Sequence, residues 1–300
     1  MRIQDIVKFV TNKENFNSVK TYIEFAEIYL KYIDKDKNLQ AIIISQNETN
    51  YRFFQYGVDA TYNITRPINS DLFYDLSSFR RASREFIGIL KHIKDPKIKN
   101  THNRDVINNT IYTIQQCIGA ALDALPSNRS NTARKINGDL FERLIRIIIS
   151  DIGIDVTEGT IKVPVMIDGE EAFKMSYQHD LIINMDNEVK AIGSVKTSSK
   201  DRIDKIFIDK FLYNKLTEKD TPHFAIFLND VQRKNTKKEN KYGISATFLP
   251  GHFKGYTIKL NPLDGVYYCD IRPNMKTDKI LKKHIKTFDY FLFDDVWKFI

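Results

Sequence analysis

The segment that decides the fold is HDLIINMDNEVKAIGSVKTSSKDRIDKIFIDK, residues 179–210. Asp180 precedes an apolar run, and the pair Asp186-Asn187 favours a tight turn. After the turn the chain is again rich in apolar residues up to Lys196, which is typical of a second strand. A polar segment and a helical pattern follow. We therefore predict a β-hairpin that leads into a helix.

This hairpin brings a carboxylate to the rim of a buried strand. An unpaired carboxylate beside Leu181, Ile182 and Ile183 costs desolvation free energy unless a cation compensates it. In the structural interpretation, Asp180 forms a salt bridge or caps the strand. A metal-binding Asp180 in a phosphodiesterase centre is the functional one, because metal ions neutralise charge at phosphorus and activate water.

Two lysines compete for the place beside Asp180. A turn of two or three residues puts Gly193 or Ser194 opposite it. In the three-residue register Lys196 points to the same face of the sheet as Asp180, because side chains alternate along a strand. Lys190 would lie opposite Asn184, roughly 13 Å away along the strand. We therefore prefer Lys196, which would orient the attacking water or stabilise charge on phosphorus.

A metal site of this kind calls for a second carboxylate. Ser194 occupies the strand position where that carboxylate would be expected, so another element must supply it. Mg2+ prefers hard oxygen ligands, typically one or two carboxylates with waters and substrate oxygens. Asp209, two to three turns into the following helix, is one candidate. Glu142, beside Phe141 on an earlier helix, is another. Either residue could instead be a surface carboxylate of its helix.

The chain changes character near residue 126. Residues 1–125 have mainly helical patterns, the polar stretch 126–137 is the expected boundary, and residues 126–300 alternate helices and short strands. The fold class predicted is α/β (α+β), with a mixed sheet flanked by helices and a helical N-terminal region. We predict helices at 19–33, 70–93, 106–125, from 138 onward and 201–216. We predict strands at 159–166, 176–185, 188–196, 223–228, within 247–260 and at 266–271, and a basic loop at 231–242. The pattern of residues 38–63 is ambiguous, and 41–44 could be a short buried strand.

Composition narrows the class of partner. The 300 residues carry a formal net charge of +8, and a basic balance of this kind favours a polyanion, most often nucleic acid. Cys117 and Cys269 match no metal-ligand or disulfide spacing, so a reducing, cytoplasmic compartment is expected. The N-terminus lacks a signal-peptide pattern, and no apolar run is long enough to predict a membrane span.

Asp180, Ser194-Val195-Lys196 and Asp209 together resemble the active site of type II restriction endonucleases of the PD-(D/E)XK class. The run KTSSKDR at 196–202 is similar to a segment in the subgroup that recognises CCGG, CCNGG or CCWGG, such as the EcoRII catalytic domain. In that subgroup the second acid lies on the following helix. The segment RKINGDLFERLIR at 134–146 also resembles the first core helix of the family.

The resemblance implies roles for these residues. Asp180 and Asp209 would bind Mg2+, Glu142 would assist, and Lys196 would complete the catalytic centre. Two departures stand out: His179 replaces the usual proline, and Asp209 is one methylene shorter than the usual glutamate. The resemblance covers about residues 130–230, so residues 126–300 would form the endonuclease core. Residues 1–125 would dimerise or make accessory contacts with DNA.

A charged triplet follows the hairpin. Arg and Lys donate to guanine O6 and N7, and Asp accepts from the cytosine amino group, so Lys200, Asp201 and Arg202 suit the reading of G:C pairs. The structural alternative is a helix N-terminus capped by Ser199. The further DNA contacts expected on this side of the chain and on the earlier helix are Lys205, Arg134 and Lys135.

The resulting hypothesis is a Mg2+-dependent type II restriction endonuclease that cleaves double-stranded DNA at a palindrome containing CCGG or CCNGG. A palindromic site calls for a two-fold symmetric reader, so a homodimer is expected, and a tetramer is an alternative. The competing hypotheses are a repair-type or structure-specific nuclease of the same fold and a non-catalytic DNA-binding module.

Overall fold

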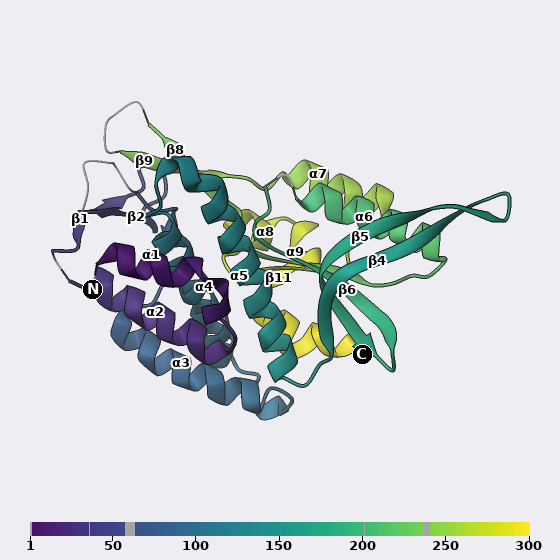
Figure 1. Ribbon diagram of the computed structural model, residues 1–300, viewed down its shortest axis with the longest axis horizontal. Coiled ribbons are helices and arrows are strands. Elements are labelled where there is room, and N and C mark those ends of the chain that lie inside the picture. Colours follow the sequence, from purple (N-terminus) through teal and green to yellow (C-terminus); the bar gives the residue numbers. More distant parts are fainter. Residues whose placement is uncertain (1, 36, 58–63, 201, 237–240) are drawn as a thin grey trace. The chain divides into compact units, whose positions relative to one another are not determined.

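A computed structural model of the chain describes residues 2–35, 37–57, 64–200, 202–236 and 241–300 (Figure 1). The chain forms two compact units. The first comprises Met1–Ile148 with Asp230–Thr247, and the second comprises Ile149–Asn229 with Phe248–Ile300. The different roles expected for residues 1–125 and 126–300 stay a prediction. The boundary between these segments lies between helices α4 (Thr101–Leu122) and α5 (Ser130–Asp151).

The first unit is mainly helical. Its helices are α1 (Ile3–Thr11), α2 (Val19–Ile33), α3 (Leu76–Lys91), α4 (Thr101–Leu122) and most of α5 (Ser130–Asp151). Its strands are β1 (Leu39–Ile44), β2 (Tyr51–Tyr56) and β3 (Ile68–Asn69), which form one antiparallel sheet, and the hairpin β8 (Val231–Asn235) and β9 (Tyr242–Ala246). Helix α4 is buried almost throughout from Val106 onward, so it is the central helix of this unit.

The second unit is built on a mixed sheet. Among the described residues the strand order is β11-β10-β7-β6-β5-β4, with bounds β4 (Val156–Ile167), β5 (Glu170–Met185), β6 (Glu188–Ser198), β7 (His223–Asn229), β10 (Gly265–Tyr268) and β11 (Ile285–Thr287). Strands β4, β5 and β6 are antiparallel, whereas β6, β7, β10 and β11 run parallel. All residues of β7 are buried, as expected for a central strand of a parallel sheet.

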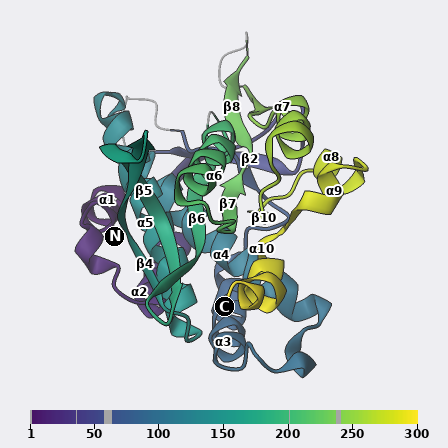
Figure 2. The same cartoon turned by 90° about the vertical axis from the view of Figure 1, so that its right-hand side faces the viewer.

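Helix α6 (Ile203–Thr217) packs against this sheet (Figure 2). Its first half contributes Phe207 to an apolar cluster with Phe227 and Phe253, and its second half contributes Tyr213 to another cluster with Val163. The remaining helices are short: α7 (Pro250–Gly255), α8 (Pro273–Thr277), α9 (Leu281–His284) and α10 (Phe288–Tyr290). The two clusters hold α6 at both ends, which matters for the side chains that it carries.

These observations confirm the predicted fold class, a mixed sheet with flanking helices. The helix predicted at 19–33 and the hairpin strands around Asp186-Asn187 are also confirmed. No helix in the described part of the chain is long and apolar enough to cross a membrane.

Several predicted boundaries were wrong. The helix expected from residue 70 begins at Leu76, because Asp75 caps it by accepting a hydrogen bond from Ser78 N–H. The helix expected at 106–125 begins at Thr101, where Asn100 is the cap, and ends at Leu122. Helix α5 begins at Ser130, so much of the expected connection at 126–137 is helical.

Two predictions of secondary structure in the later part of the chain were also wrong. The described ends of the basic stretch 231–242 belong to strands β8 and β9 and not to a loop. Val231 of β8 and Ile244 of β9 are buried in an apolar cluster, which holds the two strands in place. The stretch 247–260 is not extended: α7 and a wide helical turn at Tyr256–Leu260 place Phe253 and Tyr256 on the core.

Candidate active site

The hairpin β5–β6 carries the candidate site, and a bulge sets its register. Asp186 and Asn187 both have left-handed backbone angles, with φ of 55° and 62°, so they form a two-residue turn. The pairing then shifts, because Asn184 pairs with Val189 whereas Ile183 pairs with Ala191. The extra residue in β6 is Lys190.

The bulge gives the register that the sequence predicted for a three-residue turn. Leu181 pairs with Gly193, and continuation of this register puts Ser194 opposite Asp180. The expectation that Lys190 lies opposite Asn184 was wrong, because the bulge displaces it. Gly193 lets the hairpin lie close to β7: a Cβ atom there would lie 2.4 Å from the ring of Phe224, so a larger residue would force that ring to move.

Asp180 and Lys196 form an ion pair on this hairpin. Lys196 Nζ lies 2.6 Å from Asp180 Oδ2, and the Val195 N–H donates to the same oxygen at 2.8 Å. The side chains are 15% exposed for Asp180 and 29% exposed for Lys196, so both can still meet a ligand. Asp180 Oδ1 accepts no hydrogen bond from any residue that the structure describes. The carboxylate is thus held by one oxygen and open at the other.

The competing lysine has a different partner. Lys190 Nζ donates to Glu188 Oε2 at 2.7 Å beside the turn. Each lysine of β6 therefore has its own carboxylate, and Lys196 is the one paired with Asp180. The geometry agrees with the preference for Lys196, while its catalytic role stays a prediction.

Asp209 lies on α6, where it forms an ion pair with Lys205 one turn earlier. Its side chain is 26% exposed. Burial lowers the pKa of His179, while the negative charges of Asp209 and Asp180 act in the opposite direction. Both carboxylates therefore lie near enough to the same imidazole to influence its charge.

His179, which stands where the resemblance leads one to expect proline, lies in a cluster of rings. Its ring is parallel to that of Tyr177 at 6.1 Å and meets Tyr213 edge-on at 5.9 Å and His223 at 6.4 Å. These four residues join β5, α6 and β7. The sequence signal that could have found this cluster is the alternation of Tyr177 and His179, which marks the buried face of β5.

The donor set fits a hard cation with few protein ligands. No three His, Cys, Asp or Glu side chains of the described residues gather closely enough to form a complete metal cage. Mg2+ does not need one, because it commonly keeps several waters and binds one or two carboxylates with substrate phosphate oxygens. The open Oδ1 of Asp180 suits this role. Glu142 lies on α5 within the first unit and is half-buried, and its assisting role stays a prediction.

The residues predicted to read or hold DNA are mostly exposed. Lys200, Arg202 and Lys205 are exposed at or near the start of α6, whereas Asp201 lies outside the described residues. Helix α6 begins at Ile203, two residues later than predicted, and Arg202 occupies its N-cap position. The expected cap by Ser199 was therefore wrong, although its carbonyl accepts from Arg202 N–H at 3.2 Å.

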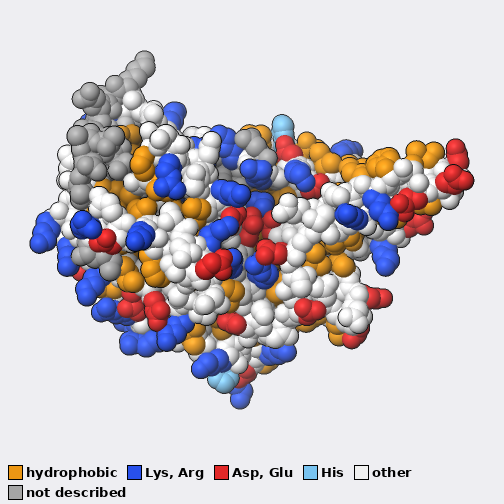
Figure 3. Space-filling model, in the orientation of Figure 1, with side chains coloured by type: hydrophobic (Ala, Val, Ile, Leu, Met, Phe, Trp, Pro, Cys, Tyr) orange, Lys and Arg blue, Asp and Glu red, His pale blue; other side chains and the backbone are white. Residues whose placement is uncertain are grey.

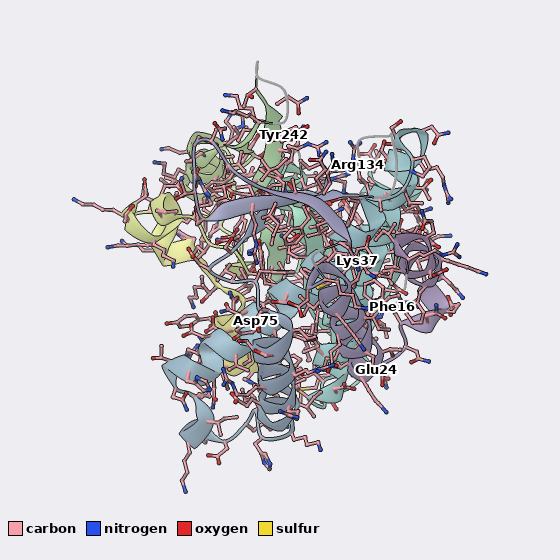
Figure 4. All side chains as sticks on the ribbon, turned by 90° about the vertical axis from the view of Figure 1, so that its left-hand side faces the viewer. Phe16, Glu24, Lys37, Asp75, Arg134 and Tyr242 are labelled. Atoms are coloured by element: carbon pink, nitrogen blue, oxygen red, sulfur yellow. The ribbon has the colours of Figure 1, made fainter. Side chains whose placement is uncertain are left out.

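The two basic residues at the start of α5 also face solvent. Arg134 donates to Asn131 Oδ1 at 3.2 Å, and Figure 4 shows it on α5. Lys135 is exposed beside it. Their predicted contact with DNA stays a prediction.

Comparison with known proteins identifies the fold. No family model and no curated protein matches this sequence. The chain is similar to the crystal structure of the Type IIP restriction endonuclease Kpn2I, with a TM-score of 0.68 and 19% identity over 99% of this chain and 97% of that one. A restriction endonuclease PspGI–substrate DNA complex matches more weakly, with a TM-score of 0.40 and 14% identity over 74% of this chain and 91% of that one. The chain thus has the fold of a restriction endonuclease.

Proposed function

We propose that this chain is a type II restriction endonuclease that hydrolyses double-stranded DNA with Mg2+ at a short palindrome containing CCGG or CCNGG. The observation that carries the proposal is the contact of 2.6 Å between Lys196 Nζ and Asp180 Oδ2. Its support is that this pair occupies a hairpin in a chain whose fold is similar to that of Kpn2I over nearly its whole length. Fold alone does not imply a reaction, so the pair of side chains is essential to the argument.

Each residue of the site has a distinct chemical task in this proposal. When bound, a divalent cation neutralises charge on the scissile phosphate and lowers the pKa of an attacking water. Asp180 Oδ1 and Asp209 would provide its carboxylate ligands. Lys196, which Asp180 orients, donates a hydrogen bond to the water or to a phosphate oxygen as negative charge develops. The products would be a 5′-phosphate and a 3′-hydroxyl.

Recognition would come from the segment that follows the catalytic strand. Lys200 and Arg202 are exposed there and present the donors that guanine edges accept. Asp201 between them would accept from a cytosine amino group. Because catalysis and recognition lie a few residues apart on one chain, two copies related by a two-fold axis would read and cut both strands of a palindrome.

The decisive experiment is digestion of a fully sequenced plasmid with Mg2+, followed by sequencing of the fragment ends. Discrete ends that share a palindrome with a CC…GG core are the expected result. Nicks at unrelated sequences would instead indicate a repair-type nuclease. An intact plasmid that the protein still binds would indicate a non-catalytic DNA-binding module.

A further inference from the structure

The β4–β5 ribbon extends beyond the sheet to which it belongs. Strand β5 pairs with β6 only at Leu181–Met185, whereas its pairing with β4 continues to Ile167 opposite Glu170. Among the residues that the structure describes, the outer part of the ribbon therefore has two strands and no third one beside them, and Figure 1 shows it projecting past α6. Isolated two-stranded ribbons are marginally stable in water, so a long one gains stability from a docking partner.

Apolar side chains continue along the ribbon past the point where α6 covers it. Near the base, Val163 and Tyr177 are buried against Tyr213 of α6. At the tip Met166, Ile167 and Phe173 remain 54%, 57% and 54% exposed. Consecutive residues of a strand project to opposite faces, so Met166 lies on the face opposite to Ile167. Ile167 and Phe173 continue the face that carries Val163 and Tyr177. Single exposed apolar residues are ordinary, but these two neighbours form a local patch of the kind that marks an interaction site.

The charge of this tip is opposite to that of the chain. Residues 166–173 contain Asp168, Glu170 and Glu171 and no basic residue, which gives them a charge of −3. The rest of the chain therefore carries +11, because the total is +8. Figure 3 shows acidic side chains gathered at the end of the ribbon with apolar side chains beside them. DNA phosphates would repel such a tip, whereas a basic protein surface would attract it.

We infer that residues 166–173, here called the ribbon tip, dock on a second copy of this chain. The inference rests on the proposed dimeric function and names the surface that forms the dimer. Docking would use the side-chain face of the ribbon, because the free edge of β4 is interrupted by Pro164, which has no N–H to pair.

The exposed area is consistent with a reciprocal contact. Ile167 and Phe173, each about half exposed on one face, offer roughly 200 Å² per tip, compared with roughly 800 Å² per partner in a standard interface. In a two-fold dimer each copy gives one tip and receives one, so the tip contributes twice. The tip would then be one component of the interface and supply its apolar anchor residues.

The test is the mass of the intact chain in solution without DNA, measured by light scattering over a concentration series. The tip variant combines Met166→Ser, Ile167→Ser and Phe173→Ser. Its matched control is Ile42→Ser with Ile44→Ser, which alters two side chains that are 56% and 57% exposed on β1 of the first unit. Unchanged circular dichroism and thermal unfolding establish that both variants fold.

We expect a dimeric wild type and control, and a tip variant whose dimer dissociation constant rises roughly a hundredfold or more, as loss of interface anchors does. The substitutions Glu170→Lys with Glu171→Lys should also weaken the dimer, with a smaller effect at high salt. A wild type that is monomeric throughout, or a tip variant that dimerises like the wild type, would overturn the inference. So would a tip variant that stays dimeric but loses DNA binding. Because mass is measured without DNA, a chain that dimerises through the tip yet cleaves nothing would refute the proposed function alone.

Discussion

Replacement of Lys196 by alanine removes the cation that the structure places against Asp180. In the intact site Asp180 Oδ2 accepts from Lys196 Nζ at 2.6 Å and from Val195 N–H at 2.8 Å. The variant keeps the second hydrogen bond and the hairpin register, since neither involves the Lys196 side chain. It therefore separates the chemistry of the lysine from the architecture that holds the carboxylate.

The expected effects on catalysis and stability differ greatly in size. Loss of a positioned proton donor or charge-stabilising group costs about 10²- to 10⁴-fold in kcat, or about 3–5 kcal/mol of transition-state stabilisation. The folded state should lose only about 1 kcal/mol, because Asp180 keeps one hydrogen bond and both side chains are partly exposed. That loss is small compared with the stability of a typical domain.

The assay is single-turnover cleavage of a duplex that contains the site found by plasmid digestion, together with binding measured without Mg2+. The control is Lys190→Ala, which removes a lysine from the same strand and from an ion pair with Glu188 of similar length. We expect Lys196→Ala to bind specifically but not cleave, and Lys190→Ala to do both. Cleavage by Lys196→Ala at the wild-type rate, or an equal loss in the two variants, would refute the role assigned to Lys196.

Four further predictions follow from the site and its surroundings. Asp209→Asn should reduce cleavage at least roughly a hundredfold, whereas Asp204→Asn on the same helix should not, and equal rates in single-turnover assays would exclude Asp209 as a ligand. Chelation of divalent cations by EDTA should abolish cleavage and excess Mg2+ should restore it, whereas digestion that persists in EDTA would exclude the metal. Asp201→Ala should relax or abolish site choice in the plasmid digest, and an unchanged set of ends would remove its base-reading role. Burial lowers the pKa of His223 from 6.5 to about 4, so the unfolded chain binds the proton first and the folded state loses stability as the pH falls from 6.5 towards 4. In urea unfolding, the wild type should lose roughly 2 kcal/mol more stability than His223→Phe between pH 7 and pH 5. Equal losses in the two proteins would contradict this.

The hairpin and its ion pair could be predicted from sequence because the forces that form them are local. The apolar run after Asp180 and the turn-forming pair at 186–187 specify two adjacent strands. Side-chain alternation then puts Lys196 on the face of Asp180, and Lys190 is excluded because it lies roughly 13 Å away along the strand. The bulge at Lys190 could not be read from the sequence, since a two-residue turn with a bulge and a three-residue turn give the same register beyond them.

The errors arose where distant partners override the local pattern. A strand was predicted within the stretch 247–260. The structure instead uses Phe253 and Tyr256 as neighbours on one helical face that packs against Phe207. Secondary structure there depends on a contact with α6 that is distant in sequence, which single-sequence patterns do not contain.

The same dependence would let a helix supply the second acid that we propose for the site. A strand position such as Ser194 is fixed by its ladder of hydrogen bonds, whereas a helix is held only by its packing. Asp209 lies between Phe207, which packs with Phe253, and Tyr213, which packs with Tyr177 and His179. These anchors restrain α6 on both sides of Asp209, and the second one ties it to the strand that carries Asp180. A carboxylate on α6 can therefore be positioned as firmly as one on the sheet, provided that the aromatic contacts around His179 are kept.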